Sequence, residues 1–103
     1  MTFLFVYGTL MPGQDAWRVL ERWTVGEPQT DAVRGAFCET DRDYPGACFD
    51  TDGMVPGVVV RLDPARLEAA LSALDRYEGP EYERVSVRTL AGVDAYAYGW
   101  IGR

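Results

Sequence analysis

The sequence has 103 residues, 48% hydrophobic and 25% charged, which is typical of one globular domain large enough to bury a core without a metal or a disulfide. Its ten basic residues are all arginines and face sixteen acids, for a net charge of −6. That balance argues against nucleic acids and anionic membranes as partners, because phosphate binding needs a basic stripe. With neither histidine nor lysine, the chain lacks Ser-His-Asp and Cys-His catalysis, the usual nitrogen ligands of zinc, a Schiff base and a P-loop lysine. Proton transfer must fall to carboxylates, tyrosines, cysteines or held water.

The chain opens with a strand that leads into a glycine-bearing loop. Residues 2–7 are rich in β-branched and aromatic side chains, which predicts a buried strand. Gly8 ends it, and a turn is marked at residues 12–13. The N–H groups of such a loop have no ladder partner and can converge on an anion. Taken alone, however, the Tyr7–Leu10 segment is a weak signal and is more typical of an ordinary strand end than of a site.

A short helix and a second strand are expected next. Apolar side chains recur at helical spacing over residues 15–23, and Asp15 is placed to cap that helix. Residues 24–30 are polar and contain glycine and proline, so we expect a loop with at most a strand edge. Residues 32–40 predict a strand, in which Gly35 indicates a bend or a close backbone approach.

The middle of the chain predicts two more strands joined by a hairpin. Residues 41–43 (DRD) indicate a charged, solvated turn, and residues 44–49 a strand. Residues 50–53 (DTDG) have the composition of a hairpin turn and too few oxygen ligands for a calcium loop. Residues 54–62 form the most apolar strand after the first, with a bulge expected at residues 56–57.

Cys38 and Cys48 are the only cysteines, and their spacing matches no metal or redox motif. The sequence shows no signal peptide and no apolar run long enough to cross a bilayer. We therefore expect a cytoplasmic protein with two reduced, half-buried thiols. A disulfide remains open if the two residues face each other on neighbouring strands.

Residues 63–77 carry the clearest helix pattern. Asp63 is a suitable N-cap, and the proline after it is tolerated in the first turn. Four apolar residues then follow at i, i+3, i+4 and i+7. Residues 79–80 (GP) prevent continuation, so Glu78 is expected at the exit of an amphipathic helix.

The chain ends with two alternating strands, over residues 82–90 and 93–101. Because strands outnumber helices, we expect an α+β fold, a small mixed β-barrel or curled sheet with two main helices outside it, rather than a doubly wound fold. Residues 1–103 form a single domain.

Glu78 is a candidate proton acceptor. The last carbonyls of a helix carry partial negative charge, Glu81 and Glu83 lie nearby in the sequence, and burial would act in the same direction. Together these effects raise the pKa of a carboxyl group toward neutrality. The alternative is a solvated acid, or one paired with Arg76 or Arg84.

Three segments together resemble the γ-glutamylcyclotransferase-like family: residues 6–10 (VYGTL), 74–79 (LDRYEG) and 82–85 (YERV). The likeness is to the small bacterial branch near the γ-glutamylamine cyclotransferases and AIG2-like proteins, and it covers nearly the whole chain. Weaker matches to the family pattern are Gly35 with Phe37, Tyr44-Pro45, and residues 55–60 before Asp63-Pro64.

This resemblance implies a β-barrel with flanking helices and a cavity at the end of the first strand. The loop made of Tyr7, Gly8, Thr9 and Leu10 would hold the glutamyl moiety of a small γ-glutamyl substrate. Glu78 matches the family's catalytic glutamate, which would move a proton from the α-ammonium to the departing amine. The products would be 5-oxoproline and a free amine or amino acid, with no metal and no cofactor.

Other positions are less determined by the resemblance. Tyr82 and Tyr98 are expected either to line the cavity or to fill the barrel core. Residues 11–15 (MPGQD) depart from the basic residue and asparagine that relatives often have there, which leaves the leaving group open. We expect a monomer or a weak homodimer.

Two alternatives belong to other functional classes. A non-catalytic module could use the same loop to bind a carboxylate-bearing metabolite, but an anion binder gains nothing from an acid such as Glu78 beside its ligand. A partner-binding domain would predict an exposed apolar patch, which the alternating strands do not show.

Overall fold

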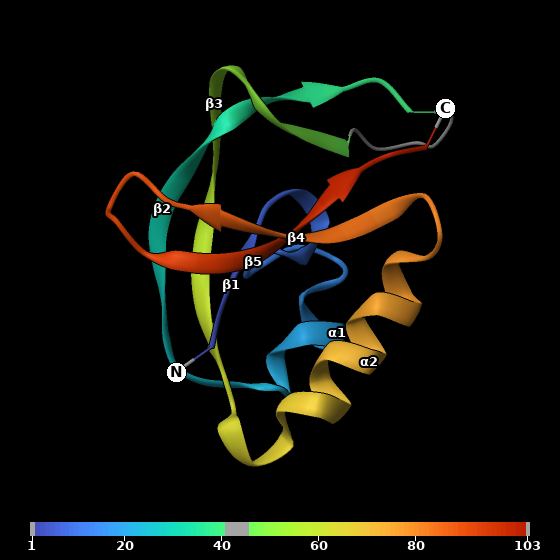
Figure 1. The fold of residues 1–103 in the computed structure, drawn as a ribbon. Coiled ribbons are helices and arrows are strands. Elements are labelled where there is room, and N and C mark those ends of the chain that lie inside the picture. Colours follow the sequence, from blue (N-terminus) through green and yellow to red (C-terminus); the bar gives the residue numbers. More distant parts are fainter. Residues whose placement is uncertain (1, 41–45, 103) are drawn as a thin grey trace.

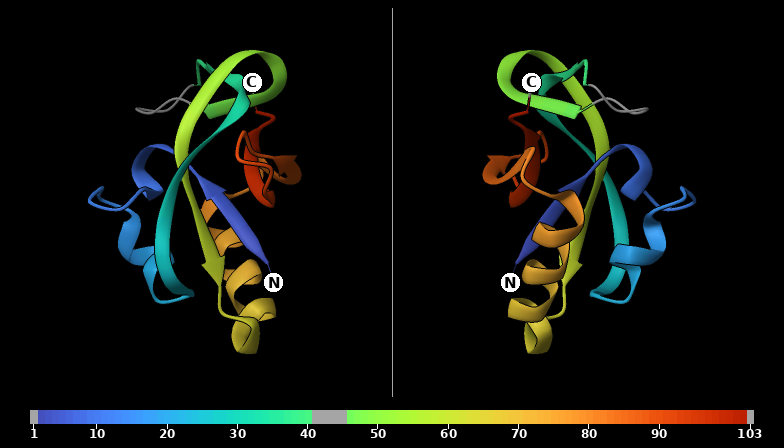
Figure 2. Two further views of the ribbon diagram at one scale, coloured as in Figure 1. Left: turned by 90° about the vertical axis from the view of Figure 1, so that its left-hand side faces the viewer. Right: turned by 90° about the vertical axis from the view of Figure 1, so that its right-hand side faces the viewer.

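The structure, a computed structural model, describes residues 2–40 and 46–102. In chain order the elements are β1 (Phe3–Val6), the 3-10 turn η1 (Gly8–Leu10), α1 (Trp17–Glu21), β2 (Thr24–Cys38), β3 (Gly46–Leu62), the 3-10 turn η2 (Pro64–Arg66), α2 (Leu67–Glu78), β4 (Tyr82–Arg88) and β5 (Asp94–Trp100). The strands form one sheet in the order β2-β3-β1-β5-β4. The sheet curls into a half barrel with both helices outside it (Figures 1 and 2). The predicted α+β fold with a mixed sheet and two flanking helices is confirmed.

β1 is the central strand and is paired on both edges. It runs antiparallel to β3, with Leu4 opposite Val60, and parallel to β5, where Leu4 is opposite Tyr96. The β2–β3 and β4–β5 pairs are antiparallel. As an interior strand, β1 is also covered on both of its faces, by one hydrophobic core on each. A strand covered in this way needs apolar side chains on both faces, which explains its unbroken apolar run.

Two hydrophobic cores lie on opposite faces of β1. Leu4 and Val6 contact the side that faces the helices, whereas Phe5 points into the curled sheet. The helix-side core is Leu4, Val6, Leu10, Ala16, Leu20, Val58, Val60, Leu62, Leu74 and Tyr98. The barrel core is Phe5, Val33, Ala47, Val55, Val59, Ala95 and Ala97. Each large side chain buried there stabilises the fold by roughly 1.5–3 kcal/mol.

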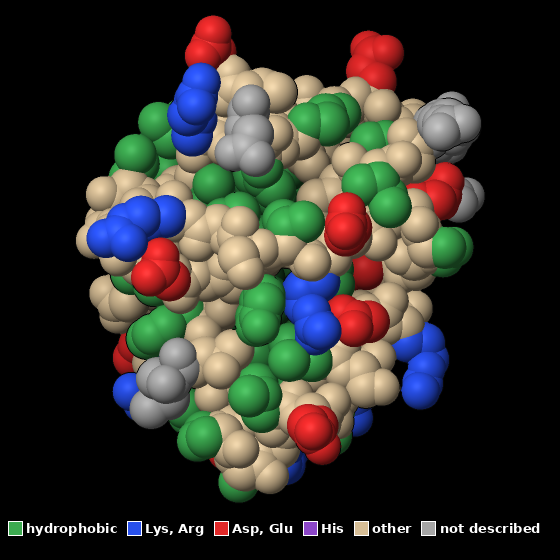
Figure 3. Space-filling view, in the orientation of Figure 1, with side chains coloured by type: hydrophobic (Ala, Val, Ile, Leu, Met, Phe, Trp, Pro, Cys, Tyr) green, Lys and Arg blue, Asp and Glu red, His purple; other side chains and the backbone are tan. Residues whose placement is uncertain are grey.

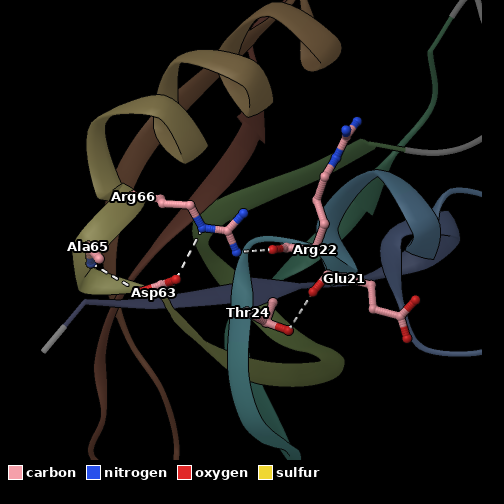
Figure 4. A network of polar contacts seen from close by, with 6 residues as sticks. All are labelled: Glu21, Arg22, Thr24, Asp63, Ala65 and Arg66. Carbon is pink, nitrogen blue, oxygen red and sulfur yellow. Dashed lines mark hydrogen bonds and ion pairs between the residues drawn. The ribbon is translucent and has the colours of Figure 1, made fainter.

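The Asp63 cap that the sequence predicted is present, but it caps the 3-10 turn η2, which leads into α2; α2 itself has Arg66 as its N-cap residue and no side-chain cap. The Asp63 carboxylate accepts a hydrogen bond from the Ala65 N–H at 3.0 Å. The Arg66 guanidinium donates to the same carboxylate at 3.1 Å and also to the Arg22 carbonyl (Figure 4). These bonds tie the chain after α1 to the beginning of α2.

The predicted hairpin at residues 50–53 is wrong. Phe49 pairs with Gly35 and Met54 pairs with Arg34, so the segments on both sides of residues 50–53 pair with the same strand. The four intervening residues therefore form an irregularity within β3. No bulge occurs at residues 56–57, which stay in register opposite Ala32 and Asp31.

Two further expectations need correction, and two lie outside the described residues. Residues 24–30 belong to β2 rather than to a loop, because β3 is long enough to pair with them. α1 has Ala16 as its N-cap residue and no side-chain cap, so Asp15 does not cap it. The predicted turn at residues 41–43 and the Tyr44-Pro45 segment fall in the undescribed part of the chain.

Cys38 and Cys48 form a disulfide, with their Cα atoms 6.0 Å apart, so the expectation of two reduced thiols is wrong. Strand pairing brings them together, since Ala36 lies opposite Cys48 and Cys38 lies opposite Gly46. Cys38 and Cys48 are thus diagonal neighbours on paired strands, a relation that depends on register and is not visible in the sequence.

Acidic and arginine side chains are interspersed over the face drawn in Figure 3, with hydrophobic side chains gathered near its centre. Among residues 2–40 and 46–102, no helix has the length and apolarity needed to cross a membrane. Those residues also contain no group of three or more potential metal ligands.

Candidate active site

A cavity of about 560 Å³ lies where the end of β1, η1, the last turn of α2 and the β4–β5 pair meet. All seven residues that the sequence proposed for a site line it: Tyr7, Gly8, Thr9, Leu10, Glu78, Tyr82 and Tyr98. Folding therefore brings an acid from late in the chain opposite a backbone turn near its beginning. The volume is within the range of small-molecule sites.

The turn at the cavity is built around Gly8. Its φ of +62° lies in the left-handed region, which glycine adopts at little cost. The Met11 N–H donates to the Gly8 carbonyl at 3.2 Å, and the Ala16 N–H donates to the Thr9 carbonyl at 2.9 Å. Because a helical turn leaves its first N–H groups without an internal acceptor, the amides of Gly8 and Thr9 are available to an anion or a carbonyl oxygen.

Glu78 is the last residue of α2 and is half-buried at the cavity wall. Burial raises the pKa of its carboxyl group to about 7. Within the described residues, no hydrogen bond or ion pair reaches this carboxylate, and Arg84 lies instead 3.6 Å from Asp75. The expected direction of the pKa shift is confirmed, but its cause is burial rather than the neighbouring acids.

The hydroxyl groups of Tyr7 and Tyr98 are bonded to the protein. The Tyr7 hydroxyl donates to the Tyr98 carbonyl oxygen at 2.6 Å and accepts from the Ala47 N–H at 3.2 Å. The Tyr98 hydroxyl donates to Asp75 Oδ1 at 2.6 Å. Burial raises the pKa of both phenols well above the ordinary value, so both remain neutral donors. Their rings line the cavity while their hydroxyls hold the surrounding structure.

Sequence reasoning missed five lining residues and one supporting residue. The additional lining residues are Phe5, Val6, Met11, Gln14 and Tyr77. All five lie within four positions of a predicted residue along the chain, which is the only signal that could have indicated them. Asp75, which holds the Tyr98 hydroxyl, lies three positions before Glu78 and hence on the same side of α2.

The sequence profile of one protein family matches residues 4–103, nearly the whole chain. That family is described as "Gamma-glutamyl cyclotransferase, AIG2-like". No curated protein sequence gives a significant match.

Solved structures share the fold at low sequence identity. The uncharacterized protein PH0828 from Pyrococcus horikoshii has a TM-score of 0.73 at 21% identity, covering 100% of this chain and 80% of that one. An AIG2-like protein from Mus musculus has a TM-score of 0.74 at 21% identity, covering 96% and 76%. YkqA from Bacillus subtilis has a TM-score of 0.77 at 24% identity, covering 98% of this chain but 36% of YkqA. At these identities the likeness concerns the fold.

Proposed function

The chain belongs to the AIG2-like gamma-glutamyl cyclotransferase family, and we propose that it releases 5-oxoproline and a free amine or amino acid from a γ-glutamyl amide. One observation carries the proposal: Glu78, whose carboxyl group has a pKa of about 7 and no partner among the described residues, lines the same cavity of about 560 Å³ as the turn that begins at Gly8. The first backbone amides of such a turn lack an acceptor within it. A proton acceptor and a site for the negative groups of the substrate are thus present together.

The reaction needs a folded substrate more than it needs a reactive side chain. The α-amine of the glutamyl group attacks its own γ-carbonyl carbon, so nucleophile and electrophile belong to one molecule. The covalent link between the two groups already replaces a bimolecular encounter, so what the protein can add is to hold the substrate in a near-attack conformation. We assign this task to the cavity walls, with Tyr7, Tyr82 and Tyr98 restricting the glutamyl chain.

Glu78 moves the proton. Its carboxylate accepts a proton from the α-ammonium, and the freed amine forms the new C–N bond to the γ-carbon. The protonated Glu78 then donates to the amide nitrogen as the original C–N bond breaks. The ring nitrogen loses its second proton to give the lactam N–H of 5-oxoproline, and the released amine takes up that proton and leaves as an ammonium. The amides of Gly8 and Thr9 bind negative oxygens of the substrate: the α-carboxylate, which is charged from the start, and the γ-carbonyl oxygen, which becomes negative as the amine attacks. The hydrogen bonds to the γ-carbonyl oxygen therefore strengthen as the reaction proceeds.

The proposal is tested by offering the protein a panel of γ-glutamyl amines and γ-glutamyl dipeptides and measuring 5-oxoproline by mass spectrometry. We expect turnover of at least one member of the panel. Binding of several members without 5-oxoproline would instead support a non-catalytic carboxylate-binding module on the same fold.

The pH dependence of turnover should report Glu78. Because the carboxylate form accepts the proton and the pKa is about 7, kcat/KM should fall about tenfold per pH unit below pH 7 and level off above it. Initial rates of 5-oxoproline formation between pH 5 and pH 9 measure this limb. Rates that stay level down to pH 5, as expected for a group that titrates near the ordinary glutamate value of 4.5, would mean that another group is titrating or that Glu78 is solvated when substrate binds.

A further inference from the structure

Tyr98 joins the two halves of the site through two different groups of one residue. It lies on β5, next to both β1 and β4 in the sheet, and is almost fully buried. Its main-chain carbonyl accepts a hydrogen bond from the Tyr7 hydroxyl at 2.6 Å, and its own hydroxyl donates to Asp75 at 2.6 Å. One bond reaches the N-terminal segment of the chain and the other reaches α2.

The carbonyl of Tyr98 controls the approach to the backbone turn. Tyr7 is the residue immediately before η1 and is its N-cap, so its anchored ring is attached directly to the turn that carries the Gly8 and Thr9 amides. The Tyr7 ring also contacts Phe37 and Phe49 edge-on, with centroids 6.0 and 6.2 Å away. The Tyr7 ring is therefore held inside the barrel, and the hydrogen bond from its hydroxyl connects it to the Tyr98 carbonyl on β5.

The hydroxyl of Tyr98 is bonded near the end of α2. Asp75 precedes Glu78 by three positions, so the two residues lie about one turn apart on the same side of the helix. Asp75 does not line the 560 Å³ cavity; it lines a neighbouring cavity of about 600 Å³, and Tyr82 and Tyr98 line both. Asp75 thus acts on Tyr98 from behind the cavity wall.

A cation supports the Asp75 carboxylate. Arg84 on β4 has its Nη1 atom 3.6 Å from Asp75 Oδ2, and its guanidinium lies 5.1 Å from the centre of the Tyr96 ring. The pair is partly exposed, so its own energy is small. Its effect is directional, because it turns one carboxylate oxygen toward Arg84 and leaves the other for Tyr98.

We propose that Tyr98, through its carbonyl and its hydroxyl, is a positioning residue that sets the separation between the Gly8–Thr9 amides and Glu78, with Asp75 as its partner. The proposal rests on the proposed function, because that separation matters only if a substrate spans it. A short O–H···O⁻ bond such as Tyr98–Asp75 is among the stronger hydrogen bonds in proteins and well suited to holding a helix end.

Tyr98→Phe removes the hydroxyl and keeps the ring, so the cavity wall is preserved. We expect kcat to fall about 10- to 100-fold, as for a displacement of about 1 Å between reacting groups, with KM changed less than about twofold. A kcat within twofold of the parent would overturn the proposal. So would an unchanged kcat with a raised KM, since that would make the hydroxyl a substrate contact.

Three further variants separate positioning from general loss of structure. Asp75→Ala should lower kcat as much as Tyr98→Phe does. Asp75→Asn, whose amide oxygen can still accept the hydrogen bond from the hydroxyl, should recover most of kcat; equal loss in both Asp75 variants would contradict the proposal.

Tyr7→Phe breaks the other bond, between the Tyr7 hydroxyl and the Tyr98 carbonyl, and should also lower kcat. In the double variant Tyr7→Phe/Tyr98→Phe, kcat should fall by less than the product of the two single effects. Either broken bond alone already lets the distance between the Gly8–Thr9 amides and Glu78 vary. Effects that multiply independently would show that the two bonds do not act as one bridge.

The matched control is Asp94→Ala, which removes an exposed aspartate on the same strand, paired with Arg88 at 3.3 Å. It should leave kcat and KM unchanged, and a loss like that of Asp75→Ala would contradict the proposal.

Amide hydrogen exchange tests the bridge even if no substrate is turned over. The Gly79 N–H donates to the Asp75 carbonyl at 3.1 Å, and the Met11 N–H donates to the Gly8 carbonyl at 3.2 Å. Tyr98→Phe should speed exchange at Gly79 and leave Met11 unchanged, whereas Tyr7→Phe should do the reverse. If the parent yields no 5-oxoproline but exchange follows this pattern, the proposed function fails and the bridge stands. Unchanged exchange at both amides in both variants would overturn the bridge.

Discussion

Replacing Glu78 by glutamine is expected to reduce turnover by about 10²- to 10⁴-fold, the usual contribution of a general acid–base group. Glutamine has nearly the same shape but cannot accept the proton from the α-ammonium. Because the backbone amides of Gly8 and Thr9 are untouched, substrate should still bind. The measurements are 5-oxoproline formation in single-turnover assays and calorimetric binding of a γ-glutamyl amide that the parent accepts.

The same change should stabilise the protein at high pH. Burial raises the pKa of Glu78 from 4.5 to about 7, so the folded state holds its proton more tightly than the unfolded chain. Stability therefore decreases as pH rises from 4.5 to 7 and stays lower above pH 7. Glutamine never ionises and therefore avoids this loss of stability. The loss is roughly 2–3 kcal/mol once solvent screening at a half-buried site is taken into account. Denaturant unfolding at pH 8 and at pH 4 should show a gain at the first pH only.

Glu83→Gln is the matched control for Glu78→Gln. Glu83 is an exposed acid on β4, five residues further along the chain. Its replacement should change neither turnover nor the difference in stability between pH 4 and pH 8. If Glu78→Gln turned over as fast as the parent, or if both variants lost activity equally, Glu78 would not be the proton carrier.

Gly57→Ala is expected to destabilise the fold by at least about 3 kcal/mol, the upper range for overpacking a core. A Cβ atom at Gly57 would lie 2.1 Å from the Val6 carbonyl oxygen and 2.8 Å from the Phe5 ring. These contacts involve backbone and a fully buried ring, so neither can move aside without separating β1 from β3. Since Val6 leads directly into the cavity, activity should fall along with stability.

Gly99→Ala provides the comparison for Gly57→Ala. Gly99 also lies within a strand, but its added Cβ would have its nearest contact at 3.4 Å, with the Phe49 ring. We expect a change of less than about 1 kcal/mol in urea unfolding, as for a tolerated strand substitution. Equal destabilisation by both changes would mean that loss of glycine flexibility, rather than the clash with β1, is responsible.

The elements that the sequence predicted well are those whose determinants are local. The apolar run of β1, the Asp63 cap of the turn η2 that leads into α2, and the alternation of β4 and β5 each depend on neighbours within a few residues. The candidate site was also accessible from the sequence, because its main parts lie in two short motifs and all seven proposed residues line one cavity.

Pairing between distant segments explains the errors. Residues 50–53 have the composition of a hairpin turn, yet both of their flanks pair with β2, so the chain continues as one long strand. Residues 24–30 read as a loop because their own side chains are polar, and they become strand because β3 is there to accept their hydrogen bonds. The disulfide follows from the same register.

By itself, the sequence determined the chemistry that this protein has at its disposal: carboxylates and tyrosines without histidine or lysine, a glycine turn after a buried strand, and an acid at the end of an amphipathic helix. Only the tertiary structure decided that Glu78 is half-buried without a partner among the described residues, and that the Tyr7 and Tyr98 hydroxyls bind Tyr98 and Asp75. The reason is physical. Composition and local periodicity fix which groups exist and which face they share, whereas burial and hydrogen-bond partners depend on contacts between segments up to 91 residues apart.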